Sequence, residues 1–137
     1  MVRGQPTPII VPEIISQLRH GRSLSLGNTK PRRDYVHTAD CARSLRGLAH
    51  QPPGSCQTVN IASGQDASVD ELVGLISELL DEPIEVTVDP ARFRQADKLV
   101  QKADIGRLGR LLSWQPEMPL RTGMQELLQY EKLLPRL

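Results

Sequence analysis

A strong helix signal that leads directly into a strand signal constrains the fold of this chain more than any other feature. Ser68 and Glu71 form a capping-box pattern, in which each side chain can bond to the other residue's backbone N–H at the start of a helix. Apolar residues follow at helical spacing to about Asp81. Residues 84–88 then alternate like a strand and end at Asp89-Pro90. This order favours a mixed α/β architecture.

The rest of the chain continues the same interleaving of short elements. We expect further helices over residues 11–20, 38–49, about 104–112 and 120–134, and further strands over residues 23–26, 34–37 and 58–61. Thr38 or Asp40 is expected to cap the second helix. The apolar side of that helix is formed by Ala42, Leu45, Leu48 and Ala49. Residues 91–103 are expected to form a loop, and the chain as a whole, residues 1–137, is expected to form a single small α/β domain.

Composition and charge restrict the kind of core that the chain can form and the kind of ligand that it could bind. The chain has 3% aromatic residues, so its core must be aliphatic. Residues 51–91 contain eight acidic residues and no Lys or Arg, whereas the segments on either side are basic. If the basic segments meet in the fold, their concavity would attract an anion. The alternative is that the charges coat separate solvated faces.

Several classes of function lack their sequence signatures. No glycine-rich dinucleotide loop follows a strand, and neither Tyr35 nor Tyr130 has a Lys four residues later, so we expect no catalytic and no cofactor-binding residue in this chain. His37 and Cys41 are too few to hold a metal ion. Cys41 is expected on a buried helix face, and the two cysteines fit reduced thiols. The polar start and the lack of a long apolar run lead us to expect a cytoplasmic protein without a signal peptide or membrane segment.

Arginines in turns are the strongest candidates for ligand binding. Arg32 and Arg33 precede a predicted strand, and Arg92 and Arg94 follow Asp89-Pro90. A guanidinium group can bind a phosphate through two parallel hydrogen bonds. Each arginine could instead be a solvated surface charge or a partner in a salt bridge, so the residues alone leave both interpretations open.

Four motifs in order resemble the C-terminal half of the extended short-chain dehydrogenases that modify nucleotide sugars, the NAD-dependent epimerase/dehydratase family, and are most similar to GDP-mannose 4,6-dehydratase. They are Leu26-Gly27-Asn28 with Arg33-Asp34-Tyr35-Val36-His37 and Asp40, then Val59-Asn60-Ile61-Ala62-Ser63-Gly64 with residues 68–72, then Asp89-Pro90 with Arg94 and Asp97, and finally Asp104 with Arg107, Leu111, Trp114 and Pro116. The resemblance covers about residues 4–133. The family usually has Gly where this chain has Ser113.

The resemblance implies a role for several residues. Arg33 would bind the diphosphate or the nucleotide, Arg94 would lie near the diphosphate, and Asp97 would lie near the nucleotide. Leu26 and Asn28 belong to the strand and turn that would line the base pocket. Asp40 and Asp104 would be structural, because each can accept hydrogen bonds from backbone N–H groups.

The resemblance implies a nucleotide-diphosphate-sugar binding lobe, with a GDP-sugar favoured, that lacks the Rossmann core and is not catalytic by itself. NAD(P) would bind to the other half of a full-length parent, of which this chain would be a piece. Apolar surface left bare by the missing half is expected to cause self-association. The alternatives are a structural or regulatory remnant of the family, or an anion- or nucleic-acid-binding module that uses Lys30, Arg32 and Arg33, although few aromatic residues make nucleic acid a poor fit.

Overall fold

The structure is a computed structural model that describes residues 9–52, 54, 57–93 and 98–135. It contains five α-helices within these residues: α1 (Ile10–Leu18), α2 (Thr38–Ala49), α3 (Val69–Leu80), α4 (Gly106–Leu112) and α5 (Leu120–Tyr130). The strands there are β1 (Ser23–Leu26), β2 (Arg32–Asp34), β3 (Asp66–Ser68), β4 (Glu85–Val88) and β5 (Val100–Gln101). The predicted mixed α/β class is confirmed.

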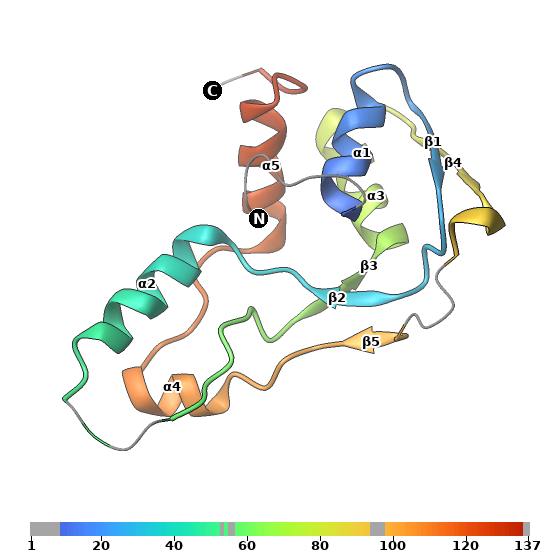
Figure 1. The fold of residues 1–137 in the computed structure, drawn as a ribbon. Coiled ribbons are helices and arrows are strands. Elements are labelled where there is room, and N and C mark those ends of the chain that lie inside the picture. The colour runs from blue at the N-terminus through green and yellow to red at the C-terminus, as the bar shows by residue number, and fades with distance from the viewer. Residues whose placement is uncertain (1–8, 53, 55–56, 94–97, 136–137) are drawn as a thin grey trace.

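Two small sheets organise the chain. β1 and β4 form a parallel pair in which Leu26 lies opposite Val88. β2 is the centre of a three-stranded sheet, antiparallel to β3 and parallel to β5. Helices α1, α3 and α5 gather at one end of the molecule, and α2 and α4 extend at the other end beyond the three-stranded sheet (Figure 1).

The main core lies between helices α1, α3 and α5 and the inner face of β1. Alternation in β1 turns Leu24 and Leu26 inward and leaves both serines of that strand exposed. Ile14, Leu72 and Met124 are fully buried in the same cluster. The cluster contains aliphatic side chains and Met124, as the shortage of aromatic residues predicts. Burying such side chains is the main driving force for this part of the fold.

The capping box at the start of α3 is confirmed. The Ser68 hydroxyl accepts a hydrogen bond from the Glu71 N–H at 3.1 Å, and the Glu71 carboxylate accepts one from the Ser68 N–H at 2.8 Å. The strand predicted over residues 84–88 forms as β4. The sequence predicts this helix and strand correctly, because the signals for both lie within a few neighbouring residues.

Helix α2 forms where predicted, but its cap and its buried face differ from the prediction. His37 caps it, because its Nδ1 atom accepts a hydrogen bond from the Ala39 N–H at 3.2 Å. The buried side chains are Asp40 and Ser44, whereas Leu45 is 59% exposed. Cys41 is half-buried rather than buried. Ala42, Leu45 and Ala49 of the predicted apolar side are exposed and Leu48 is half-buried, whereas Leu112 of α4 lies against Gly47.

The strand predicted over residues 58–61 is wrong: this segment lies in an irregular conformation. A strand needs a neighbouring strand with which to exchange hydrogen bonds, and no described segment pairs with this one. The segment is instead held by hydrogen bonds to α4 and the residues before it: its own Asn60 Nδ2 donates to the Asp104 carbonyl at 3.0 Å, and the Arg107 side chain donates to the Thr58 carbonyl at 2.9 Å.

Further boundaries differ from the sequence prediction. The helix expected over residues 120–134 ends at Tyr130 as α5. The extended piece expected over residues 34–37 is β2, at Arg32–Asp34. The expected loop over residues 91–103 contains the strand β5, and a short 3₁₀ helix, η1 (Pro90–Arg92), overlaps its start. Both strands are very short, and only their pairing in the tertiary structure defines them.

Candidate functional site

Arg33 lies at the centre of the three-stranded sheet, which fixes its backbone from both sides. It is aligned with Ala67 of β3 and with Gln101 of β5. Its guanidinium group donates to the carbonyl of Arg32 at 2.9 Å and to the carbonyl of Lys98 at 2.8 Å. The second bond holds Arg33 against the connection between β4 and β5.

The arginine before it has a different environment. Arg32 pairs with Asp66 and with Glu71, and it also donates to the Asp66 carbonyl. The Ser68 N–H and Arg32 together hold the pKa of the Glu71 carboxyl below its usual value. Side chains of successive strand residues point to opposite faces, so Arg32 and Arg33 serve different surfaces. Arg32 therefore has a structural role at the start of α3.

The turn after β1 lies against the turn after β4. A Cβ atom added to Gly27 would be 2.8 Å from the Arg92 carbonyl oxygen, so only glycine allows this approach without a shift of the backbone. The Asn28 side chain accepts a hydrogen bond from the Lys30 N–H at 3.1 Å and shapes the turn. Leu26 as a whole residue is 1% exposed and its carbonyl accepts a hydrogen bond from the Asp89 N–H at 2.7 Å, so it belongs to the core and its predicted contact with a base stays a prediction.

The connection between β4 and β5 begins and ends with exposed apolar side chains. Phe93 is 48% exposed, Leu99 is 70% exposed and Val100 is 55% exposed. Arg92 bonds to Glu13 at 3.0 Å and to the Ser25 carbonyl at 2.8 Å, so it anchors this connection to α1 and β1.

Arg94 and Asp97, two residues predicted for the site, lie outside the described residues. Their predicted roles therefore stay predictions. The described part of the same connection does approach Arg33, because the Lys98 carbonyl accepts its hydrogen bond.

The aspartate next to Arg33 has a structural task that sequence reasoning did not assign to it. Asp34 accepts hydrogen bonds from the Ser63 N–H at 2.7 Å, the Ser63 hydroxyl at 2.6 Å and the Gly64 N–H at 2.9 Å. Gly64 has φ of 71°, a conformation that favours glycine. This carboxylate fixes the turn before β3 and so supports the sheet around Arg33. Its place beside Arg33 in the first motif was the available signal.

Asp40 and Asp104 accept hydrogen bonds from main-chain N–H groups, as expected, but Asp40 does not cap α2 as the sequence predicted. Asp40 accepts from the main-chain N–H groups of Glu117 and Met118 and pairs with Arg43 at 2.6 Å. Burial raises its pKa, but these hydrogen bonds outweigh burial and the net pKa is lowered. Asp104 accepts from the Gly106 N–H at 2.7 Å at the start of α4.

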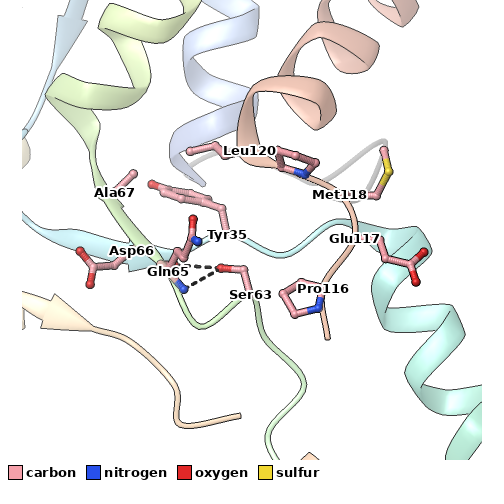
Figure 2. Close-up of a pocket in the computed structure, with 10 residues that line it drawn as sticks. Tyr35, Ser63, Gln65, Asp66, Ala67, Pro116, Glu117, Met118 and Leu120 are labelled. Carbon is pink, nitrogen blue, oxygen red and sulfur yellow. Dashed lines mark hydrogen bonds between the residues drawn. The ribbon is translucent and has the colours of Figure 1, made fainter. Parts of the chain in front are cut away.

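A hollow of about 200 Å³ lies at the end of β2, between Ser63, Glu117 and Leu120. Figure 2 shows the ring of Tyr35 on one side of it, between Ala67 and Leu120. The hydroxyl of Tyr35 is buried and makes no hydrogen bond with any described residue. Burial raises the pKa of Tyr35, and the nearby charge of Arg33 opposes that rise.

The described residues contain neither a cluster of metal-binding side chains nor a membrane-spanning helix. No three His, Cys, Asp or Glu side chains in that part of the chain gather where a metal ion could bind. No helix there has the length and apolar character needed to cross a membrane.

The family match and the most similar known proteins point to the same group of enzymes. The family described as GDP-mannose 4,6 dehydratase matches residues 3–127. GDP-6-deoxy-D-mannose reductase from Pseudomonas aeruginosa is 27% identical over 83% of this chain and 38% of the relative's length. A dTDP-4-dehydro-6-deoxy-D-allose reductase from Streptomyces is 28% identical over 93% of this chain and also 38% of the relative. The chain thus spans about two fifths of the length of these relatives.

Two solved structures have the same fold as this chain. RMD from Pseudomonas aeruginosa, determined with NADPH, has a TM-score of 0.78 and 22% identity over 96% of this chain and 45% of that protein. UDP-glucuronic acid 4-epimerase from Bacillus cereus, determined with UDP-glucuronic acid and NAD, has a TM-score of 0.83 and 18% identity over 94% of this chain and 41% of that protein.

Proposed function

The chain belongs to the GDP-mannose 4,6 dehydratase family, and we propose that it is the part of such an enzyme that binds the nucleotide-diphosphate sugar. The family comprises dehydratases, epimerases and reductases of sugar nucleotides. The placement of Arg33 carries the proposal. The β2 backbone and the Lys98 carbonyl hold its guanidinium group beside the connection that bears Arg94 and Asp97.

The chemistry of that surface supports a diphosphate bound next to a base. Arg33 carries a positive charge, and a guanidinium group presents its N–H donors in a fork that matches the oxygens of a phosphate. Exposed Phe93 and Leu99 at the two ends of the same connection offer apolar contact to a flat ring. We favour a GDP-sugar, because the family description and a relative's name both contain GDP-mannose sugars.

The nicotinamide cofactor of a full-length parent would not be bound by these residues. The described residues form two small sheets, and the sequence contains no glycine-rich turn between a strand and a helix that could receive a pyrophosphate. We propose that NAD(P) and the proton-transferring groups belong to the part of the parent that this chain does not span. By itself the chain would bind the sugar nucleotide without turning it over.

Nucleic-acid binding by the Lys30–Arg33 cluster is a weaker candidate. Lys30 pairs with Asp70 at 2.8 Å, and Arg32 pairs with Asp66 and Glu71. These acids come from the acidic block of the sequence and neutralise the charges of Lys30 and Arg32. A patch that binds nucleic acid needs several charges available to phosphates.

Bare apolar surface supports the proposal that the isolated chain self-associates. Leu45 on α2, and Leu99 and Val100 at β5, are each more than half exposed. In a full-length parent the remaining part of the protein would cover such surface, and without it a second copy would do so.

Titration of the chain with GDP-mannose, UDP-glucose and dTDP-glucose, followed by NMR of arginine Nε–H signals, tests the binding function. The expected result is a saturable shift of the Arg33 signal, with GDP-mannose the tightest ligand. Arg33→Gln should weaken binding about tenfold or more, because it removes a charge-assisted contact with phosphate. Arg110→Gln is the matched control, since that exposed arginine on α4 makes no hydrogen bond with a described residue. If none of the three sugar nucleotides shifts the Arg33 signal, the result would favour a remnant of the family that no longer binds sugar nucleotides.

A further inference from the structure

A basic groove lies between the C-terminal ends of α2 and α4, at the end of the molecule away from the main core. Its volume is about 320 Å³. It is lined by Arg43, Arg46, Gly47, His50, Gln51, Leu112, Ser113 and Trp114. None of these residues is acidic. We propose that this groove is a second binding site, separate from Arg33, for a small phosphate- or carboxylate-bearing molecule.

The floor of the groove is rigid. Arg43 lies over the ring of Trp114, with 5.4 Å from its guanidinium carbon to the ring centroid. Arg43 is also held by Asp40 at 2.6 Å, by Glu117 at 2.8 Å and by the Gln115 carbonyl at 2.8 Å. Its charge is therefore largely balanced, and it acts as a fixed wall rather than as the principal anion-binding group.

Arg46 supplies the charge that remains available. Its side chain is exposed on the last turn of α2 and makes no hydrogen bond or ion pair with any described residue. Arg110 on α4 is likewise unpaired among the described residues but does not line the groove, whereas Arg19, Arg22, Arg32, Arg92 and Arg121 pair with acids. An arginine that faces a concave surface without an acidic neighbour is an attractive site for an anion.

Three other polar side chains line the groove beside Arg46, those of His50, Gln51 and Ser113. His50 Nδ1 is bonded to the Arg46 carbonyl at 2.7 Å, which fixes its ring one turn further along the helix. The Gln51 amide and the Ser113 hydroxyl complete the polar lining. The indole N–H of Trp114 has no partner among the described residues, but it is too deeply buried to be counted as a donor to the ligand.

Trp114 makes the proposal directly testable, because it is the one tryptophan of the chain and lines the groove. Its emission is measured while the intact chain is titrated with inorganic phosphate or with citrate at constant ionic strength. The expected result is a saturable change, which Arg46→Gln weakens about tenfold because one charge-assisted contact is lost. The two anions distinguish a phosphate ligand from a carboxylate ligand.

Two control variants separate this site from other effects. Arg33→Gln should leave the titration unchanged, so that failure of the sugar-nucleotide proposal would not affect it. Arg121→Gln removes an equal charge from α5 and should also have no effect. An emission change that is linear in anion concentration, or that persists in Arg46→Gln, would overturn the proposal. Circular dichroism of each variant verifies that the exposed substitutions leave the fold intact.

Discussion

The Asp40 carboxylate accepts a hydrogen bond from the main-chain N–H of Met118 at 3.0 Å and so joins α2 to the segment that leads into α5. A second main-chain group, the N–H of Glu117, bonds to the same carboxylate at 3.1 Å. The side chain is 2% exposed and also pairs with Arg43. One buried charge thus holds together two segments that are far apart in the sequence.

Replacing Asp40 should therefore destabilise the chain. Asp40→Ala removes a buried carboxylate that accepts from the main-chain N–H groups of Glu117 and Met118 and pairs with Arg43, and we expect a loss of about 1–3 kcal/mol in the free energy of unfolding. The folded pKa of Asp40 is lowered, so its contribution is present above the unfolded value and is lost as pH falls below about 4. Urea unfolding from pH 3 to pH 7 measures both effects. A variant as stable as the wild type at pH 7 would show that the contact is unimportant.

Ser113 carries backbone strain that glycine would relieve. It ends α4 with φ of 50°, in the left-handed region. Ser113→Gly should raise the free energy of unfolding by about 1 kcal/mol, because a side chain is disfavoured there. Ser113→Ala is the control, since it keeps the Cβ atom and should give no such gain. Chemical denaturation of the three proteins compares them, and equal stability of all three would contradict the interpretation.

Gly27 and Gly74 form a matched pair of glycines. Gly27→Ala brings a Cβ atom to 2.8 Å from the Arg92 carbonyl oxygen and should cost about 1–3 kcal/mol. The change should also weaken sugar-nucleotide binding, because it displaces the turn that carries Asn28. Gly74→Ala lies inside α3 with no atom within 4 Å and should stabilise the chain by about 0.5–1 kcal/mol. Thermal unfolding of both variants tests this prediction. If the unfolding temperature moved in the same direction in both variants, the prediction would be contradicted.

Tyr35 offers a test of a buried hydroxyl. Tyr35→Phe removes a group without a hydrogen-bond partner among the described residues and should stabilise the chain by about 1 kcal/mol. Burial raises the folded pKa of Tyr35, so the wild type should lose stability as pH rises above about 10. The variant should lack that loss. Unfolding measured from pH 8 to pH 11 decides the matter, and identical alkaline profiles would refute the prediction.

Self-association through α2 is tested at its most exposed apolar residue. Leu45→Gln should shift sedimentation velocity profiles towards the monomer, because the 59% exposed leucine no longer gains from being covered. Thr122→Gln, on the exposed surface of α5, is the control and should leave the profiles unchanged. A wild-type chain that remains monomeric at high concentration would contradict the prediction.

The elements that the sequence predicts well are those whose signals are local. The capping box of α3 joins residues three positions apart, and the alternation of β1 and β4 is complete within four residues. Each signal selects the same conformation whatever the rest of the chain does. The order of these elements is also what carries the resemblance to a family.

The failures concern segments whose conformation depends on distant partners. Residues 58–61 have the composition of a strand but meet no strand among the described residues. β5 is unremarkable in sequence and exists because β2 lies beside it. In α2, periodicity alone points to Leu45 as buried, whereas the position of α4 leaves it in water.

The same division holds for the candidate site. Residue type identifies Arg32 and Arg33 equally well as phosphate ligands, because their guanidinium groups are identical. Pairing with Asp66 and Glu71 commits Arg32 to the start of α3, and the Lys98 carbonyl directs Arg33 towards the other connection. Local preferences depend on neighbouring residues, so the chain by itself determined most of its helices, the capping box of α3 and its family. Which groups each arginine contacts depends on residues brought together from distant positions, and only the tertiary structure could decide that.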